Sequence, residues 1–187
     1  MNQSIGAAKY AVETHSWKVI DSPSGKIKGT LDTADVFLDS KGAATVFWEE
    51  TNTDFTKSSL VSSTSDAGSK KWSTPTEIYK GETIMSPRLC TDKTGNAFAS
   101  WLVEVNGFFK FQGALKLLDK KWTTAVEFAS GGAGHTAQAI SPLGTAVILY
   151  GDWGILKSLT GKDLFKANSP NSLKRKGTKN AKERKDG

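Results

Sequence analysis

A unit of about 50 residues repeats along this chain, and it constrains the fold more than any other feature. Three glycines each begin a short run of β-forming residues, and each run ends in an aromatic residue six positions after its glycine. The pairs are Gly42 with Trp48, Gly95 with Trp101, and Gly144 with Tyr150. Repeats of this length predict a solenoid, a propeller or a similar array.

Two further elements recur along the chain, the first of them in two of the three units, since Ser141 takes the place of the Asp in the third. Asp39 and Asp92 stand three residues before their glycines, and Asp-x-x-Gly favours a reverse turn in which the glycine takes a positive φ. A tryptophan after a polar turn opens another short strand in each unit, with spacings of 55 and 50 residues. These tryptophans are Trp17, Trp72 and Trp122. We expect all of these aromatic side chains to pack in the core.

The strand pattern predicts an all-β fold with almost no helix. Alternation of period two is common in the chain, and no stretch keeps a 3.6-residue period over three turns. We expect a β-propeller-type array of four-stranded antiparallel meander blades, about three in number. The repeats lie near 5–20, 34–79, 87–128 and 135–159 within a domain that spans 1–160.

Residues 161–187 differ in composition. They carry the excess of positive charge that gives the whole chain its formal charge of +6, and they contain few residues able to form a core. We expect this tail to be disordered. It offers one route to nucleic acid, through Lys174, Arg175, Lys176, Lys179, Lys182, Arg184 and Lys185.

The segment from Thr64 to Trp72 resembles the Asp-box, Ser-x-Asp-x-Gly-x-x-Trp, of sialidase-like (BNR-repeat) β-propellers, with one extra residue before the tryptophan. The Asp92 to Trp101 segment is similar to the partner pattern Asp-x-x-Gly-Asn-Ala-x-Ala-x-Trp of such repeats. The resemblance is partial and its other copies are degenerate. It implies a propeller fold, and it implies that Asp66 and Gly68 shape a turn rather than take part in catalysis.

Sialidase chemistry, as the resemblance implies it, needs three arginines that grip a carboxylate. This chain has Arg88, Arg175 and Arg184, and the last two lie in the tail. Lysine does not replace the guanidinium fork. Arg88 is therefore the one candidate ligand-facing residue. We expect no catalytic residue, no cofactor and no metal site, and we expect Cys90 to be a buried, inert thiol.

The function that follows is a non-enzymatic binding or scaffold module with an unknown protein or glycan partner. A glycan-binding, lectin-like propeller and a glycoside hydrolase-related remnant are the alternatives. The paired acids Glu49 and Glu50 are not expected to act together, because adjacent strand residues point to opposite faces.

The sequence also leads to expectations about cellular location and assembly. No secretion signal and no run long enough to cross a bilayer are apparent, so we expect a cytoplasmic protein without a membrane partner, although related propellers are often secreted or envelope-associated. Propellers close with about four to eight blades. Either two copies complete a six-bladed ring or the chain is a fragment of a longer propeller.

Overall fold

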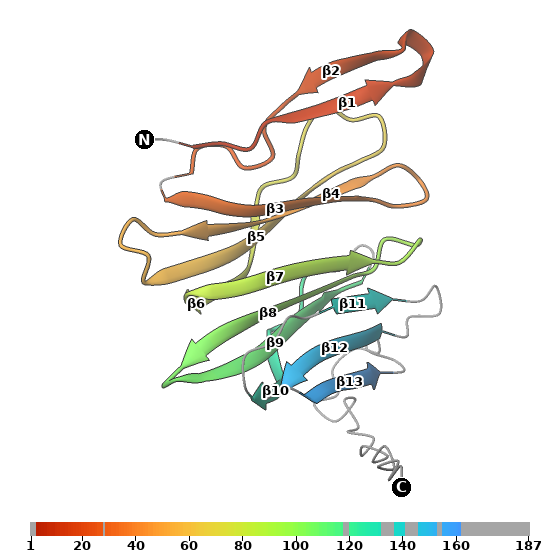
Figure 1. Ribbon diagram of the computed structural model, residues 1–187. Helices are drawn as coiled ribbons and strands as arrows, with labels where there is room; N and C mark the ends of the chain where they lie inside the picture. Colours follow the sequence, from red (N-terminus) through yellow and green to blue (C-terminus); the bar gives the residue numbers. More distant parts are fainter. Residues whose placement is uncertain are drawn as a thin grey trace, which may run out of the picture.

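The computed structural model describes residues 3–27, 29–117, 120–131, 137–140, 146–152 and 155–161. These residues form antiparallel β-sheets, and the helical structure among them is the single 3-10 turn η1 (Val12–Thr14). The sheets stack one after another along the molecule (Figure 1). The prediction of an all-β, propeller-type array is confirmed.

Four sheets make up the stack. The N-terminal hairpin pairs β1 (Ala7–Ala11) with β2 (Ser16–Ile20). Blade I contains β3 (Thr30–Leu38), β4 (Ala44–Thr51), β5 (Lys57–Ser65) and β6 (Thr76–Glu82). Blade II contains β7 (Ile84–Thr91), β8 (Ala97–Val105), β9 (Phe108–Lys116) and β10 (Val126–Gly131). The C-terminal sheet contains β11 (Ala137–Ile140), β12 (Ala146–Asp152) and β13 (Ile155–Gly161).

Each blade is a meander in which strands that follow one another in sequence pair side by side. The first strand of each blade begins earlier than the sequence indicates, at Thr30 rather than 34 and at Ile84 rather than 87. Both strands contain a register shift, between Leu31 and Ala34 in β3 and between Met85 and Arg88 in β7. The shift breaks the period-two pattern, and pattern alone therefore ends the strand too soon.

The core lies between the sheets. One apolar cluster joins blade I to blade II and contains Phe47, Leu60, Leu89 and Trp101. A second cluster joins blade II to the C-terminal sheet, and a third lies on the hairpin side of blade I around Trp48. Because successive strand residues point to opposite faces, Phe47 and Trp48 contribute to different clusters. Every sheet in the middle of the stack is thus apolar on both faces.

The expectation that every repeat tryptophan is buried is wrong for Trp17. Trp48 and Trp101 are fully buried and Tyr150 is 8% exposed, whereas the side chain of Trp17 is 71% exposed. Trp72 and Trp122 are half-buried and pack against the clusters on either side of blade I. Trp17 lies on the outward face of the hairpin, where no described sheet stacks on it. A tryptophan in this repeat is buried only when a neighbouring sheet covers it.

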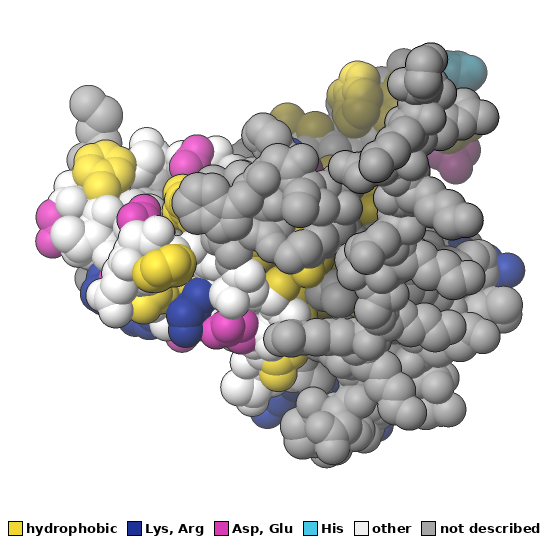
Figure 2. Space-filling model, turned by 60° about the horizontal axis from the view of Figure 1, so that its bottom comes forward, with side chains coloured by type: hydrophobic (Ala, Val, Ile, Leu, Met, Phe, Trp, Pro, Cys, Tyr) yellow, Lys and Arg dark blue, Asp and Glu magenta, His cyan; other side chains and the backbone are white. Residues whose placement is uncertain are grey.

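The surface of the described residues carries charges of both signs. In the view of Figure 2, basic and acidic side chains are mixed with small hydrophobic groups over the described part of the face. The proposed tail of 161–187, with its basic residues, and the repeat position Gly144 lie outside the described residues, apart from Gly161 at the end of β13.

Candidate functional site

A pocket of about 440 Å³ opens between the first strands of blades I and II. It is formed by the two register shifts, which displace β3 and β7 from regular pairing at the same level of the stack. Ser86, in the middle of the β7 shift, has a φ of 49°, a left-handed conformation that is uncommon outside glycine. We call this the inner pocket; its lining residues are Asp32, Thr33, Glu49, Ile84, Met85, Ser86, Pro87 and Arg88.

Glu49 is the buried acid of the inner pocket, with 2% of its surface exposed. Burial raises the pKa of its carboxyl, a hydrogen bond with Ser58 opposes that effect, and the negative charge of Asp32 adds to the rise. The Thr51 hydroxyl donates to Glu49 Oε1 over 3.4 Å and lies 3.2 Å from Ser58 Oγ. The Ile84 amide of blade II donates to Ser58 Oγ over 3.4 Å. Glu49 is therefore held in a short polar chain that links the two blades.

Arg88, the ligand-facing candidate of the sequence, lines the inner pocket from β7. Its side chain is exposed and makes no ion pair or hydrogen bond with any described residue. A guanidinium group carries five donors and stays charged at all physiological pH values. The pocket thus brings together a buried acid, the exposed acid Asp32 and an uncommitted cation.

Sequence reasoning missed this combination of acids. It compared Glu49 with Glu50, and these two side chains do lie apart. Glu49 lines the inner pocket, whereas Glu50 lines a different pocket and accepts a hydrogen bond from Trp48 Nε1 over 2.7 Å. The acid that shares the inner pocket with Glu49 is Asp32, which lies 17 residues earlier in the chain, in the register shift of β3. The one local hint of this geometry was the Ser86-Pro87 pair ahead of Arg88.

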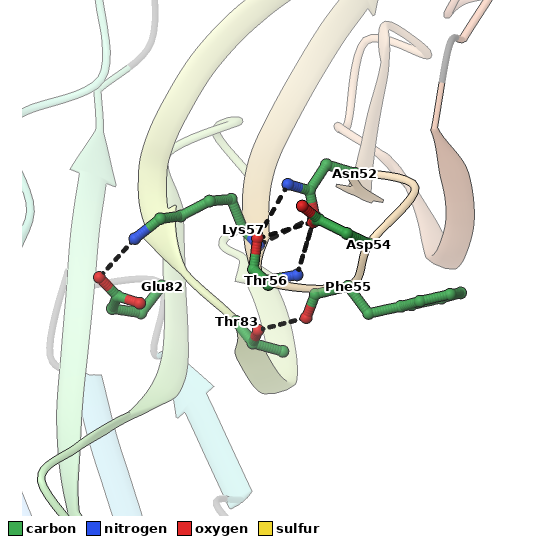
Figure 3. A network of polar contacts seen from close by, with 7 residues as sticks. All are labelled: Asn52, Asp54, Phe55, Thr56, Lys57, Glu82 and Thr83. Carbon is green, nitrogen blue, oxygen red and sulfur yellow. Dashed lines mark hydrogen bonds and ion pairs between the residues drawn. The ribbon is translucent and has the colours of Figure 1, made fainter.

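The second pocket, of about 500 Å³, lies at the turn between β4 and β5. Two of its lining residues, Asn52 and Lys57, belong to the polar network of that turn, which Figure 3 shows. Asn52 Oδ1 accepts from the amides of Thr56 and Lys57 over 2.9 and 3.0 Å, and Lys57 Nζ lies 2.6 Å from Glu82 Oε1. The Thr83 hydroxyl donates to the Phe55 carbonyl over 3.0 Å. These contacts account for the turn and leave the inner pocket as the better candidate.

The repeat residues Asp39 and Asp92 cap their turns. Asp39 Oδ1 accepts from the amides of Lys41 and Ala43 over 2.8 and 2.9 Å. Asp92 accepts from both the amide and the hydroxyl of Thr94 and from both nitrogens of Asn96, over 2.7 to 3.1 Å. Gly42 and Gly95 follow with φ values of 83° and 92°. The acidic residue and the glycine act together to close each turn.

Asp66 differs from these two residues. Its side chain is exposed and makes no hydrogen bond with a described residue, so the turn-stabilising contact implied by the Asp-box resemblance is absent there. The turn is held instead by backbone bonds, from the Ser69 amide to the Asp66 carbonyl and from the Ser73 amide to the Thr64 carbonyl. Gly68 has a φ of 78°. The turn geometry therefore comes from the backbone and the glycine.

The metal-binding and thiol groups of the described residues give no further candidate site. Within the described ranges, no three His, Cys, Asp or Glu side chains are grouped so as to hold a metal ion. Cys90 is half-buried, and burial raises the pKa of its thiol to about 12, which leaves almost no thiolate at neutral pH. The part of the chain that the structure describes has no helix with the length and apolar character needed to cross a membrane.

Comparisons with known proteins support the fold. No protein-family model matches the chain, and no curated protein matches its sequence. Its structure is similar to that of an α-L-arabinanase from Penicillium chrysogenum complexed with arabinobiose, with 13% sequence identity and a TM-score of 0.52. The match covers 84% of this chain and 54% of the arabinanase, so the chain spans about half the length of that protein. The likeness establishes a β-propeller fold, without singling out the sialidase-like group.

Proposed function

We propose that this protein is a carbohydrate-binding β-propeller module and that its ligand occupies the inner pocket. The observation that carries the proposal is the combination of Asp32, Glu49 and Arg88 at the junction of two blades. Ligand sites favour concave positions between structural units, where a few polar groups converge. Placing these repeats in the sialidase-like group is part of the same proposal.

The chemistry of the three side chains suits a polyhydroxylated ligand. Sugar hydroxyl groups can donate to the Asp32 carboxylate and accept from the guanidinium of Arg88. The raised pKa of Glu49 favours its neutral carboxyl form, which can donate as well as accept. The arabinanase with the similar fold was solved with a disaccharide, which supports saccharides as the class to test first.

Calorimetry tests the proposal by measuring binding to a panel of soluble oligosaccharides, some neutral and some containing uronic acids. Arg88→Ala should weaken the affinity at least tenfold, which corresponds to about 1.4 kcal/mol. Lys80→Ala, which alters an exposed cation at the second pocket, is the matched control and should leave binding unchanged. Failure of the whole panel to bind, or equal binding by Arg88→Ala, would contradict the proposal.

Glycoside hydrolysis is a second candidate, favoured by one observation. Burial and the negative charge of Asp32 raise the pKa of Glu49, and two carboxyl groups in different environments are the arrangement that glycosidases use. Release of reducing ends from the bound oligosaccharide distinguishes the two functions. A hydrolase would lose this release in Glu49→Gln while it kept its affinity, whereas a binding module would show none in the parent protein.

A further inference from the structure

Contacts between the sheets follow a rule that involves the repeat tryptophans. Trp122, after the third strand of blade II, packs on the cluster between blades I and II. Its Nε1 donates to Ser62 Oγ on β5 of blade I over 2.8 Å. The tryptophan of one blade thus reaches back to a serine on the third strand of the blade before it.

Trp72 occupies the same position one blade earlier. The residue after each tryptophan donates its amide to the third strand, Ser73 to Thr64 over 2.7 Å and Thr123 to Leu115 over 2.8 Å. Trp72 packs against the cluster on the hairpin side of blade I, but its Nε1 is buried and has no hydrogen-bond partner among the described residues. Ser62 lies two residues before Thr64. The equivalent position in the hairpin is Ala7, two residues before Lys9, which pairs with the residue after Trp17. The side chain of alanine has no hydrogen-bond acceptor.

Trp17 is the third member of this series and is 71% exposed. On the same outward face, the ring of Tyr10 lies 5.5 Å from the ring of Trp17, and Val19 is 87% exposed. The alternate residues Ala7, Lys9 and Ala11, on the other face of the hairpin, are half-buried. Figure 1 shows the hairpin at one end of the stack and the C-terminal sheet at the other. The outward face of the hairpin is therefore an apolar surface of the kind that another sheet covers elsewhere in the molecule.

Blade I has an exposed apolar position on the same side. Val36 lies three residues before Asp39, and Leu89 lies three residues before Asp92. Leu89 is 7% exposed because it packs against blade I, whereas Val36 is 63% exposed. The same repeat position is thus covered in blade II and open in blade I. The end of the stack has the surface properties of an interface between sheets.

We propose that this face binds the C-terminal sheet of a second copy of the chain. The register of the strands identifies the occupant. In blade I, Ser62 pairs with Phe47, the residue before the aromatic Trp48. In the C-terminal sheet, Ser158 pairs with Leu149, the residue before the aromatic Tyr150. Ser158 thus has on β13 the register position that Ser62 has on β5, and a second copy stacked in the same way places it opposite Trp17.

Such a contact is head-to-tail, since two different faces meet. Contacts of this type close into a ring or continue into a longer assembly, according to the rotation between copies. By strand register, the interface corresponds to the internal one between blades I and II, with position 17 in the place of Trp122 and position 158 in the place of Ser62. It does not depend on the inner pocket or on any ligand.

Light scattering on the full chain is the first test. The mass should rise with concentration from 20.1 kDa to a multiple of that value, and Trp17→Ser should hold it at 20.1 kDa. Trp17 is exposed, so this variant should keep the circular dichroism and the unfolding midpoint of the parent. Phe108→Ser, at another exposed aromatic position on β9, should assemble like the parent. A parent that stays at 20.1 kDa, or an assembly unaffected by Trp17→Ser, would overturn the proposal.

Disulfide crosslinking tests the register. A mixture of Trp17→Cys chains and Ser158→Cys chains should give a crosslinked pair under mild oxidation, against a background kept low by the suppressed thiolate of Cys90. Leu159→Cys is the control, because alternation puts the next position on the other face of the strand. Equal crosslinking by the two β13 variants, or none by either, would show that the assigned faces do not meet.

Discussion

At the residue scale, the aromatic residue within the second strand of each repeat is buried in the core, and the strand continues beyond it. The side chain of Trp101 is fully buried, its ring lies 5.2 Å from the ring of Tyr79, and its Nε1 donates to Gln112 Oε1 over 3.2 Å. Trp101→Ala should lower the free energy of unfolding by about 3 to 5 kcal/mol. Urea denaturation measures this loss, and Phe108→Ala, at a 63% exposed position, should change little. A loss below about 1 kcal/mol for Trp101→Ala would contradict the burial.

Glu49 should make stability depend on pH. Burial first, and then the negative charge of Asp32, raise its pKa above the ordinary value of 4.5 despite a hydrogen bond with Ser58. The folded protein then holds a proton that the unfolded chain releases, so this group's contribution to stability falls as pH rises from 4.5 through the raised pKa. Denaturation of the parent and of Glu49→Gln across this range measures the effect. The free energy of unfolding of Glu49→Gln should increase relative to that of the parent as pH rises. A constant difference between the two free energies would contradict the raised pKa.

Turns that look alike in sequence differ at the scale of the structural element. Asp92 is 5% exposed and accepts hydrogen bonds from Thr94 and Asn96, whereas Asp66 is exposed and its carboxylate is uncommitted among the described residues. Asp92→Ala should cost about 1 to 3 kcal/mol, because amides in a tight turn lose their acceptor. Asp66→Ala, the matched control in the Asp-box turn, should stay within about 0.5 kcal/mol of the parent. Equal losses would mean that the carboxylate of Asp66 also supports its turn.

The Asp92 turn should also respond to acid. Burial alone would raise the pKa of this carboxyl, but the hydrogen bonds from Thr94 and Asn96 together outweigh it and lower the pKa below 3.8. The stabilisation is complete above 3.8 and disappears as pH falls through the lowered value. The difference between the parent and Asp92→Ala should therefore shrink in strong acid, and unfolding measured over that range checks the direction.

The whole molecule is a stack in which stability should vary from sheet to sheet. The first seven residues of β8 are all buried, whereas β1 and β2 have no buried residue. Amide hydrogen exchange should therefore be slowest in β8 and fast in the N-terminal hairpin, because local opening there exposes little apolar surface. Exchange followed by mass spectrometry on a dilute sample gives this order. Uniform protection across the sheets would contradict it.

Much of the local structure is determined by the sequence itself. Period-two alternation gives the strands, and Asp-x-x-Gly gives the turns at Asp39 and Asp92, because these preferences depend on residues only a few positions apart. The repeat then gives the meander blades and the propeller-type array. The same reasoning placed Glu49 and Glu50 on opposite faces, which the two pockets bear out.

The tertiary structure decided which of these residues are buried and which meet. Trp17, Trp72 and Trp122 have equivalent places in the repeat, yet only Trp17 is exposed, because its burial depends on a neighbouring sheet and not on its own strand. The inner pocket likewise arises from two register shifts in different blades, which bring Asp32, Glu49 and Arg88 together. Contacts between sheets join residues far apart in the chain, and no local preference specifies them.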